Sequence, residues 1–104
     1  MRGHAMVIWK PHVENVAQLS EPELLHFARV YQRAERALID VTGAARAVML
    51  KLGIITPHLH VHIYPVSADL DRAAVMEIIE GRRREERDED IVRMLRERLT
   101  SSSF

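Results

Sequence analysis

Three histidines occur at alternate positions, His58, His60 and His62, and are interleaved with aliphatic residues. If this run is a β-strand, the three imidazoles project from one face, because successive side chains of a strand point to opposite sides of the sheet. Imidazoles aligned in this way can support nucleophilic catalysis or bind a metal ion. A purely structural role is a third interpretation, although burying several imidazoles stabilises little unless each finds a hydrogen-bond partner.

A metal site would draw on the same histidines. Side chains four positions apart on a strand, such as those of His58 and His62, lie roughly 13 Å apart along the backbone. One strand therefore supplies two ligands more easily than three. The chain contains no cysteine, which excludes disulfides and thiolate ligands. We expect a site without metal or cofactor and keep metal binding as an alternative.

Two further strands are predicted beside the histidine strand. Residues 5–9 and 47–52 are short apolar runs of the kind that form strands. In the histidine strand, residues 57–65, aliphatic side chains alternate with the imidazoles, so they face a core on the other side of the sheet. Gly53 opens a tight connection into this strand.

One long amphipathic helix is predicted between the first two strands. It begins after a capping box formed by Ser20 and Glu23, carries apolar residues at spacings of three and four, and ends near Gly43. Together these elements predict an α+β fold, in which a small antiparallel sheet packs against one long helix.

The C-terminal part is predicted to be helical. Ser67 and Asp69 are candidate N-caps for a helix over residues 70–80. A dense run of mixed charge follows, and residues 91–99 then have the pattern of a last amphipathic helix, packed on the domain or on a partner chain.

The chain is accordingly divided into a domain over residues 1–81 and a charged helical extension over residues 82–104. The extension ends in a frayed tail, residues 100–103.

Composition limits the range of partners. The 104 residues suffice for one small domain, whose modest core oligomerisation would stabilise. Basic and acidic residues balance at 15 each, which gives no electrostatic reason to expect nucleic acid or an anionic membrane as partner. Neither a signal peptide nor a membrane span is visible. We expect a cytoplasmic protein, with neither nucleic acid nor a membrane as partner.

Two segments of the chain resemble the histidine triad (HIT) family of nucleotide hydrolases and transferases. Residues 3–12, Gly-His-Ala-Met-Val-Ile-Trp-Lys-Pro-His, are similar to the family's strand and turn of the form GHxLVIPKxH. Residues 58–64, His-Leu-His-Val-His-Ile-Tyr, match its signature of three histidines each followed by hydrophobic residues. The two segments occur in the family's order, with a single helix between them, which makes the resemblance more specific than one short pattern.

The resemblance implies hydrolysis or transfer at a nucleoside phosphate through a covalent histidine–nucleotide intermediate. His60 would be the nucleophile, His62 would contact the phosphate, and His58 would orient or polarise the site. His12 matches an additional histidine that supports the triad from the neighbouring turn. Positioned donors can stabilise such a transition state without a metal ion. Members are commonly dimers whose sheets join, so the resemblance also implies a homodimer.

The segment before the triad departs from the family pattern. Typical members carry Gly-Gln-Ser/Thr there, whereas this chain has Gly53-Ile54-Ile55-Thr56-Pro57. Isoleucine cannot form hydrogen bonds, and loss of such a donor typically costs on the order of 3 kcal/mol of barrier. Gly53 and Thr56 remain the candidates for the phosphate and leaving-group environment. Thr56 shares a face with His58 only if the strand extends that far.

A second departure concerns the nucleoside. The family's N-terminal helix and first strands have no counterpart in these 104 residues, and no acidic residue that could bind ribose hydroxyls precedes Glu14. The nucleoside pocket is therefore expected to be built differently, or the ligand is not a standard nucleotide. The alternative is a non-catalytic nucleotide-binding or regulatory module that retains the histidine face.

Other aromatic and histidine residues receive simpler interpretations. His26 lies on the polar flank of the predicted helix and is expected to be exposed. Trp9 is most simply a core residue, and it lies close enough to the site to stack on a ligand. His4 matches the family's "GH", but no chemistry is assigned to it.

Overall fold

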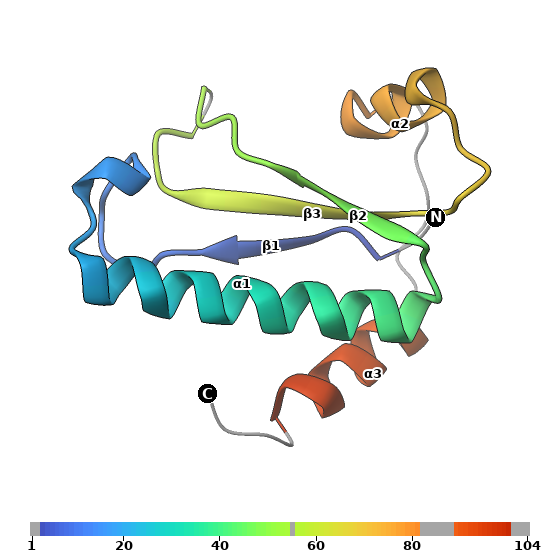
Figure 1. Cartoon of the computed structure of the whole chain (residues 1–104), viewed down its shortest axis with the longest axis horizontal. Coiled ribbons are helices and arrows are strands. Elements are labelled where there is room, and N and C mark those ends of the chain that lie inside the picture. Colours follow the sequence, from blue (N-terminus) through green and yellow to red (C-terminus); the bar gives the residue numbers. More distant parts are fainter. Residues whose placement is uncertain (1–2, 55, 82–88, 101–104) are drawn as a thin grey trace.

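A three-stranded antiparallel sheet carries the histidines on its central strand. The computed structural model describes residues 3–54, 56–81 and 89–100. Within these ranges the strands are β1 (Ala5–Ile8), β2 (Arg46–Leu50) and β3 (His60–Val66), in the order β1-β3-β2. Both neighbours of β3 run antiparallel to it (Figure 1). The predicted α+β fold is confirmed.

Helix α1 (Glu21–Thr42) packs across one face of this sheet (Figure 1). Its capping box forms as predicted, because the backbone N–H of Ser20 donates to Glu23 Oε1 at 2.8 Å and the backbone N–H of Glu23 donates to Ser20 Oγ at 3.3 Å. At the other end, Gly43 takes the left-handed conformation with φ 71° and closes the helix. Local sequence signals therefore set both ends of α1.

The aliphatic residues of the histidine run form the centre of the core. Leu59, Val61 and Ile63 are 0%, 4% and 0% exposed, and they pack with Phe27 and Leu38 of α1. The alternation predicted from the sequence is confirmed, since the intervening histidines lie on the opposite face. This packing fixes the faces of β3, because a slip of one residue would bury the imidazoles.

The histidine strand begins later than predicted. The strand prediction started at residue 57, but β3 starts at His60, because the backbone N–H of His58 donates to the carbonyl of Thr56 in a tight turn at 2.8 Å. Both backbone polar groups of Leu59 are nevertheless hydrogen-bonded. Its N–H donates to the carbonyl of Val13 at 2.7 Å, and its carbonyl accepts from the backbone N–H of Trp9 at 3.1 Å. The alternation of faces therefore continues outward to His58, but not to Thr56.

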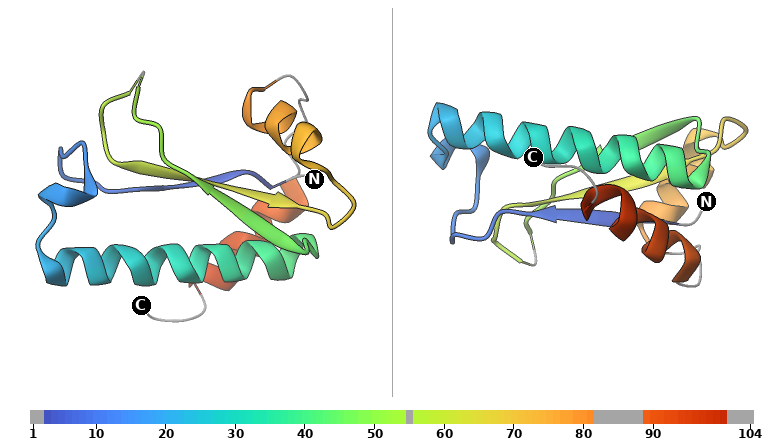
Figure 2. Two further views of the ribbon diagram at one scale, coloured as in Figure 1. Left: turned by 45° about the horizontal axis from the view of Figure 1, so that its top comes forward. Right: turned by 90° about the horizontal axis from the view of Figure 1, so that it is seen from below.

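Two helices complete the described chain. Helix α2 (Arg72–Ile79) lies on the face of the sheet opposite α1, whereas α3 (Glu89–Thr100) packs against α1 (Figures 1 and 2). Thr100, predicted to be frayed, is the last residue of α3. The charge run over residues 82–88 and the tail over residues 101–104 lie outside the described residues.

The predicted N-caps of α2 were wrong. The cap is Asp71, whose Oδ1 accepts from the backbone N–H of Ala74 at 2.9 Å. Ser67 belongs instead to a preceding turn, in which its carbonyl accepts from the N–H of Leu70 at 3.3 Å. This turn delays the helix by two residues. None of the described helices is long and apolar enough to cross a membrane.

Candidate active site

The three histidines form a row on the face of the sheet that α1 leaves uncovered. His58, His60 and His62 are each half-buried, and the rings of His60 and His62 are 5.0 Å apart in an edge-on arrangement. The register places Ile8 of β1 beside His60 and Met6 beside His62. These two flanking side chains are 56% and 51% exposed, so the row lies in an apolar and open setting.

His60 is held in one tautomer by its own strand. Its Nδ1 lies 2.6 Å from the carbonyl oxygen of His58. A carbonyl can only accept, so Nδ1 carries the proton and the neutral ring keeps a lone pair on Nε2. An unprotonated, oriented nitrogen is what attack on a phosphoryl centre requires.

His58 is anchored to the neighbouring strand–turn segment. Its Nε2 donates to the carbonyl oxygen of Trp9 at 2.5 Å. The ring of His12 meets the ring of His58 edge-on, with centroids 5.6 Å apart. The sequence interpretation placed His12 in support of the triad, and the structure brings it to the first histidine of the row. Its role in the reaction stays a proposal.

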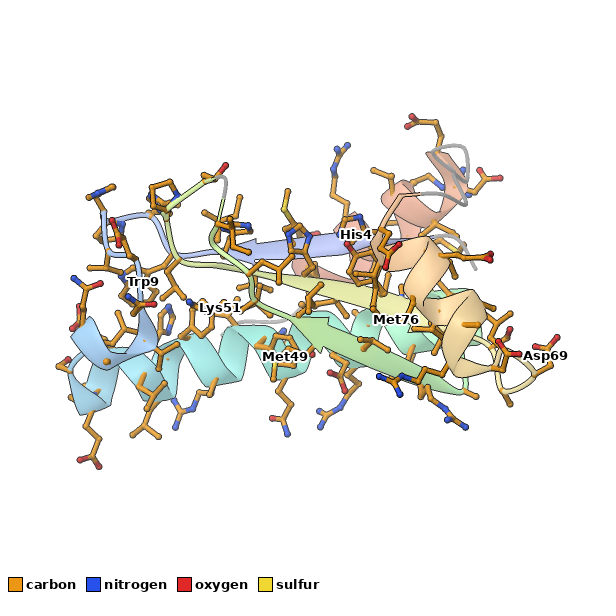
Figure 3. The ribbon with its side chains drawn as sticks, turned by 90° about the horizontal axis from the view of Figure 1, so that it is seen from above. His4, Trp9, Met49, Lys51, Asp69 and Met76 are labelled. Carbon is orange, nitrogen blue, oxygen red and sulfur yellow. The ribbon has the colours of Figure 1, made fainter. Side chains whose placement is uncertain are left out.

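His4 joins the site, although the sequence interpretation assigned it no chemistry. Its Nε2 lies 2.8 Å from Nδ1 of His62, within hydrogen-bond distance. Its ring also stacks on Tyr64, with centroids 4.2 Å apart and an interplanar angle of 6°. His4 lies over the sheet at the β1 side (Figure 3). The spacing of the residues could have predicted this placement. His4, Met6 and Ile8 occupy alternate positions and therefore share the face of the sheet that carries the histidine row.

The surroundings favour the neutral forms of this pair of imidazoles. Burial lowers the pKa of His4, and the neighbouring His62 lowers it further. Burial also lowers the pKa of His62, with a smaller contribution from His60. Burial raises the pKa of the Tyr64 phenol, which therefore stays protonated beside them. One N–H is shared across the His4–His62 hydrogen bond, so the neutral pair can accept a further proton.

This pair predicts a specific pH dependence of stability. The folded pKa values lie below the ordinary value of 6.5, so the unfolded chain takes up protons first as the pH falls. The free energy of unfolding should be unaffected by the pair above pH 6.5 and should decrease as the pH falls below it. Urea denaturation between pH 7.5 and 5 should show a shallower decrease in His4→Phe, which keeps the stack on Tyr64 but cannot titrate. An equal slope in both proteins would contradict this assignment.

Gly53 and Thr56 contact the histidine row less directly than their expected place beside the phosphate and leaving group suggested. Gly53 has φ 67°, a conformation that favours glycine in the turn after β2. Thr56 is exposed, and the atom through which it meets the histidine run is its carbonyl oxygen. Ile54 is 81% exposed, and its side chain offers no hydrogen-bond donor. Their part in the leaving-group environment stays a proposal.

Trp9 and His26 behave as the sequence indicated. Trp9 is half-buried against the core and meets Phe27 edge-on at 6.1 Å, and His26 is exposed on α1. Within the described ranges, no three histidine, aspartate or glutamate side chains are grouped to hold a metal ion.

The fold and the histidine row define an α+β domain of the histidine-triad type. The model of the HIT domain family matches residues 1–69, and the chain therefore belongs to this family. Membership supports a nucleotide-related hydrolase, transferase or regulatory function in general terms.

A solved structure agrees with this fold. The chain resembles a Hit-like protein involved in cell-cycle regulation from Bartonella henselae, crystallised with an unknown ligand. The TM-score is 0.62 at 20% identity, over 91% of this chain and 69% of that one. At this identity the likeness concerns the fold alone. A comparison with curated proteins found no match.

Proposed function

We propose that this protein hydrolyses or transfers a nucleoside phosphate through a covalent intermediate on His60. The observation that carries the proposal is the hydrogen bond from His60 Nδ1 to the carbonyl of His58, at 2.6 Å. It leaves Nε2 as an oriented lone pair at the centre of a row of imidazoles. Family membership supports a nucleotide-like ligand as the reacting molecule.

The reaction proceeds in two displacements. His60 Nε2 attacks phosphorus, a P–N bond forms, and the bond from phosphorus to the leaving group breaks. The His4–His62 pair takes up a proton from solvent and passes it to the departing leaving group, while His62 Nε2–H donates to a phosphoryl oxygen. Water then attacks the same phosphorus, its proton returns to the pair, and the nucleoside monophosphate and free His60 are released.

The test of this function is turnover with a metal chelator present. Adenosine 5′-phosphoramidate and diadenosine polyphosphates are offered to the full chain in EDTA, and release of AMP is followed by chromatography. Release that is insensitive to EDTA supports the proposal. Absence of release with measurable binding of AMP would instead establish the alternative, a nucleotide-binding or regulatory module.

The alternative is favoured by one specific observation. Ile54, in the segment where typical members place polar side chains, is 81% exposed and cannot donate to a leaving group. A module that binds a nucleotide without fast turnover would fit this surface.

The proposal has two further parts, which concern the chain as a whole. We divide it into a domain over residues 1–81 and an extension over residues 82–104. We also propose a cytoplasmic location, with which the absence of cysteine is in keeping.

A homodimer is proposed through the free edge of β2. Among the described strands β2 has one neighbour, and Met49 on this edge strand is 61% exposed. An unpaired edge strand with an exposed apolar side chain is a ready template for pairing with a second copy. Met49→Lys is expected to convert dimer to monomer in light scattering coupled to gel filtration. Arg46→Lys, on the same strand, is the control and should leave the mass unchanged. A wild-type monomer would contradict the proposal.

A further inference from the structure

The start of the described chain, at Gly3, lies against both α1 and α3. Gly3 has φ 108°, a conformation that residues with a side chain rarely adopt. A Cβ atom at this position would lie 2.9 Å from Thr42 Cγ2 and 3.1 Å from Leu38 Cδ1, both on α1, and 3.6 Å from Ile91 Cγ2 on α3. Glycine therefore allows a close approach of the backbone to two helices at once.

Hydrogen bonds fix the α1 side of this contact. Thr42 Oγ1 donates to the carbonyl of Leu38 at 2.7 Å and accepts from the backbone N–H of Ala44 at 3.2 Å. These two bonds hold the Thr42 side chain in one rotamer, with its methyl group toward Gly3. Leu38 is 0% exposed, so it cannot move aside without disturbing the core.

Ile91, in the first turn of α3, forms the other side of the contact. Leu95, one turn further along, packs against the core cluster, and Arg98 Nη1 donates to Asp40 Oδ2 on α1 at 2.9 Å. These contacts are spread along the length of the helix, which lies beside α1 (Figure 2). They hold α3 in place and, with it, Ile91 against Gly3.

The residue after Gly3 is His4, whose imidazole belongs to the candidate site. The ladder between β1 and β3 begins at Ala5, one residue later, so it does not by itself fix the backbone of His4. The neighbouring contacts must do so. On one side these are the contacts of Gly3 with the two helices, and on the other the His4 ring stacks on Tyr64 and lies 2.8 Å from His62.

We propose that Ile91 of α3 is a positioning residue, which acts through Gly3 to hold His4 against His62. The inference rests on the proposed function, in which the His4–His62 pair passes a proton to the leaving group. The HIT domain match covers residues 1–69, so the positioning helix lies outside it. A small misplacement of a reacting group lowers the rate of the chemical step. The helix therefore acts on the reaction from the side of the sheet opposite the histidine row.

Nitrogen-15 NMR of the imidazole rings tests this positioning without reference to turnover. Ile91→Ala removes the Cγ2 methyl group that lies against Gly3, whereas Ile91→Val keeps it. The ring signals of His4 and His62 are expected to move in Ile91→Ala, because their hydrogen bond depends steeply on distance and angle. In Ile91→Val they should keep their wild-type positions. Unchanged ring signals in a folded Ile91→Ala protein would overturn the proposal.

Two further variants separate this contact from general stability. Val30→Ala removes aliphatic atoms beside the core, about 18 Å from Thr42 along α1, and should leave both ring signals in place. Gly3→Ala disturbs the same contact from the other side without removing a core atom, and should move them. If Ile91→Ala does not fold, the Gly3→Ala protein decides, and unchanged ring signals there would equally count against the proposal.

Steady-state kinetics of the full chain with adenosine 5′-phosphoramidate then measures the consequence for the reaction. In Ile91→Ala, kcat is expected to fall by about tenfold or more while KM stays within about twofold, because the pair acts on the leaving group. Ile91→Val should retain the wild-type kcat. Moved ring signals with an unchanged kcat would refute a role of this contact in the reaction. No turnover in the wild type would contradict the proposed function, whereas the ring signals would still decide whether Ile91 positions His4.

Discussion

Replacement of His60 by alanine is expected to reduce release of AMP from adenosine 5′-phosphoramidate by about a thousandfold or more, because the attacking nitrogen is removed. The fold should survive this change. The His60 ring lies half-buried on the open face of the sheet, and its Nδ1 hydrogen bond goes to a carbonyl two residues earlier on its own strand. The free energy of unfolding should stay within about 1 kcal/mol of wild type.

A matched control separates this effect from the general loss of a histidine. His26→Ala removes an exposed imidazole of α1 that has no part in the row, and turnover should stay within about twofold of wild type. Substantial activity remaining in a folded His60→Ala protein would show that His60 is not the nucleophile. Equal losses in both variants would indicate damage to the fold instead.

The second large effect is expected on the other face of the same strand. Val61 is 4% exposed and lies in the core cluster with Leu38 and Ile63. In Val61→Asp a carboxylate without a partner would be buried there, which is expected to cost about 4 kcal/mol or more of the free energy of unfolding. For a domain of this size such a loss is a large part of the whole stability.

Urea denaturation of Val61→Asp beside His60→Ala measures the difference between the two faces. The two changes are at adjacent positions, so the strand, its neighbours and its depth in the sheet are matched. The expected result is an unfolded or strongly destabilised Val61→Asp protein and a near-normal His60→Ala protein. The reverse pattern would show that the faces of β3 are inverted.

Those features of the fold that depend on local signals could be predicted. The capping box of Ser20 and Glu23, the glycine at residue 43 and the alternation along the histidine run each act over a few residues, and each is present in the structure. Features that depend on competing turns were missed. The Thr56–His58 turn delays β3, and the turn that begins at Ser67 moves the cap of α2 to Asp71.

In the candidate site, too, the features set by local sequence could be predicted and those set by contacts between distant residues could not. The common face of His58, His60 and His62 follows from the period of a strand, so it could be predicted. The contact between His4 and His62 joins residues 58 positions apart, and it requires the register in which Met6 lies opposite His62.

The most direct test of the central claim is to trap the intermediate on His60. The protein is mixed with adenosine 5′-phosphoramidate, stopped in denaturant at alkaline pH, because a P–N bond hydrolyses in acid, and its intact mass and peptides are measured. Added mass of one adenylyl group on the peptide containing His60, absent in His60→Ala, is the predicted result. Turnover without such an adduct at any reaction time, or an adduct that persists in His60→Ala, would contradict the account.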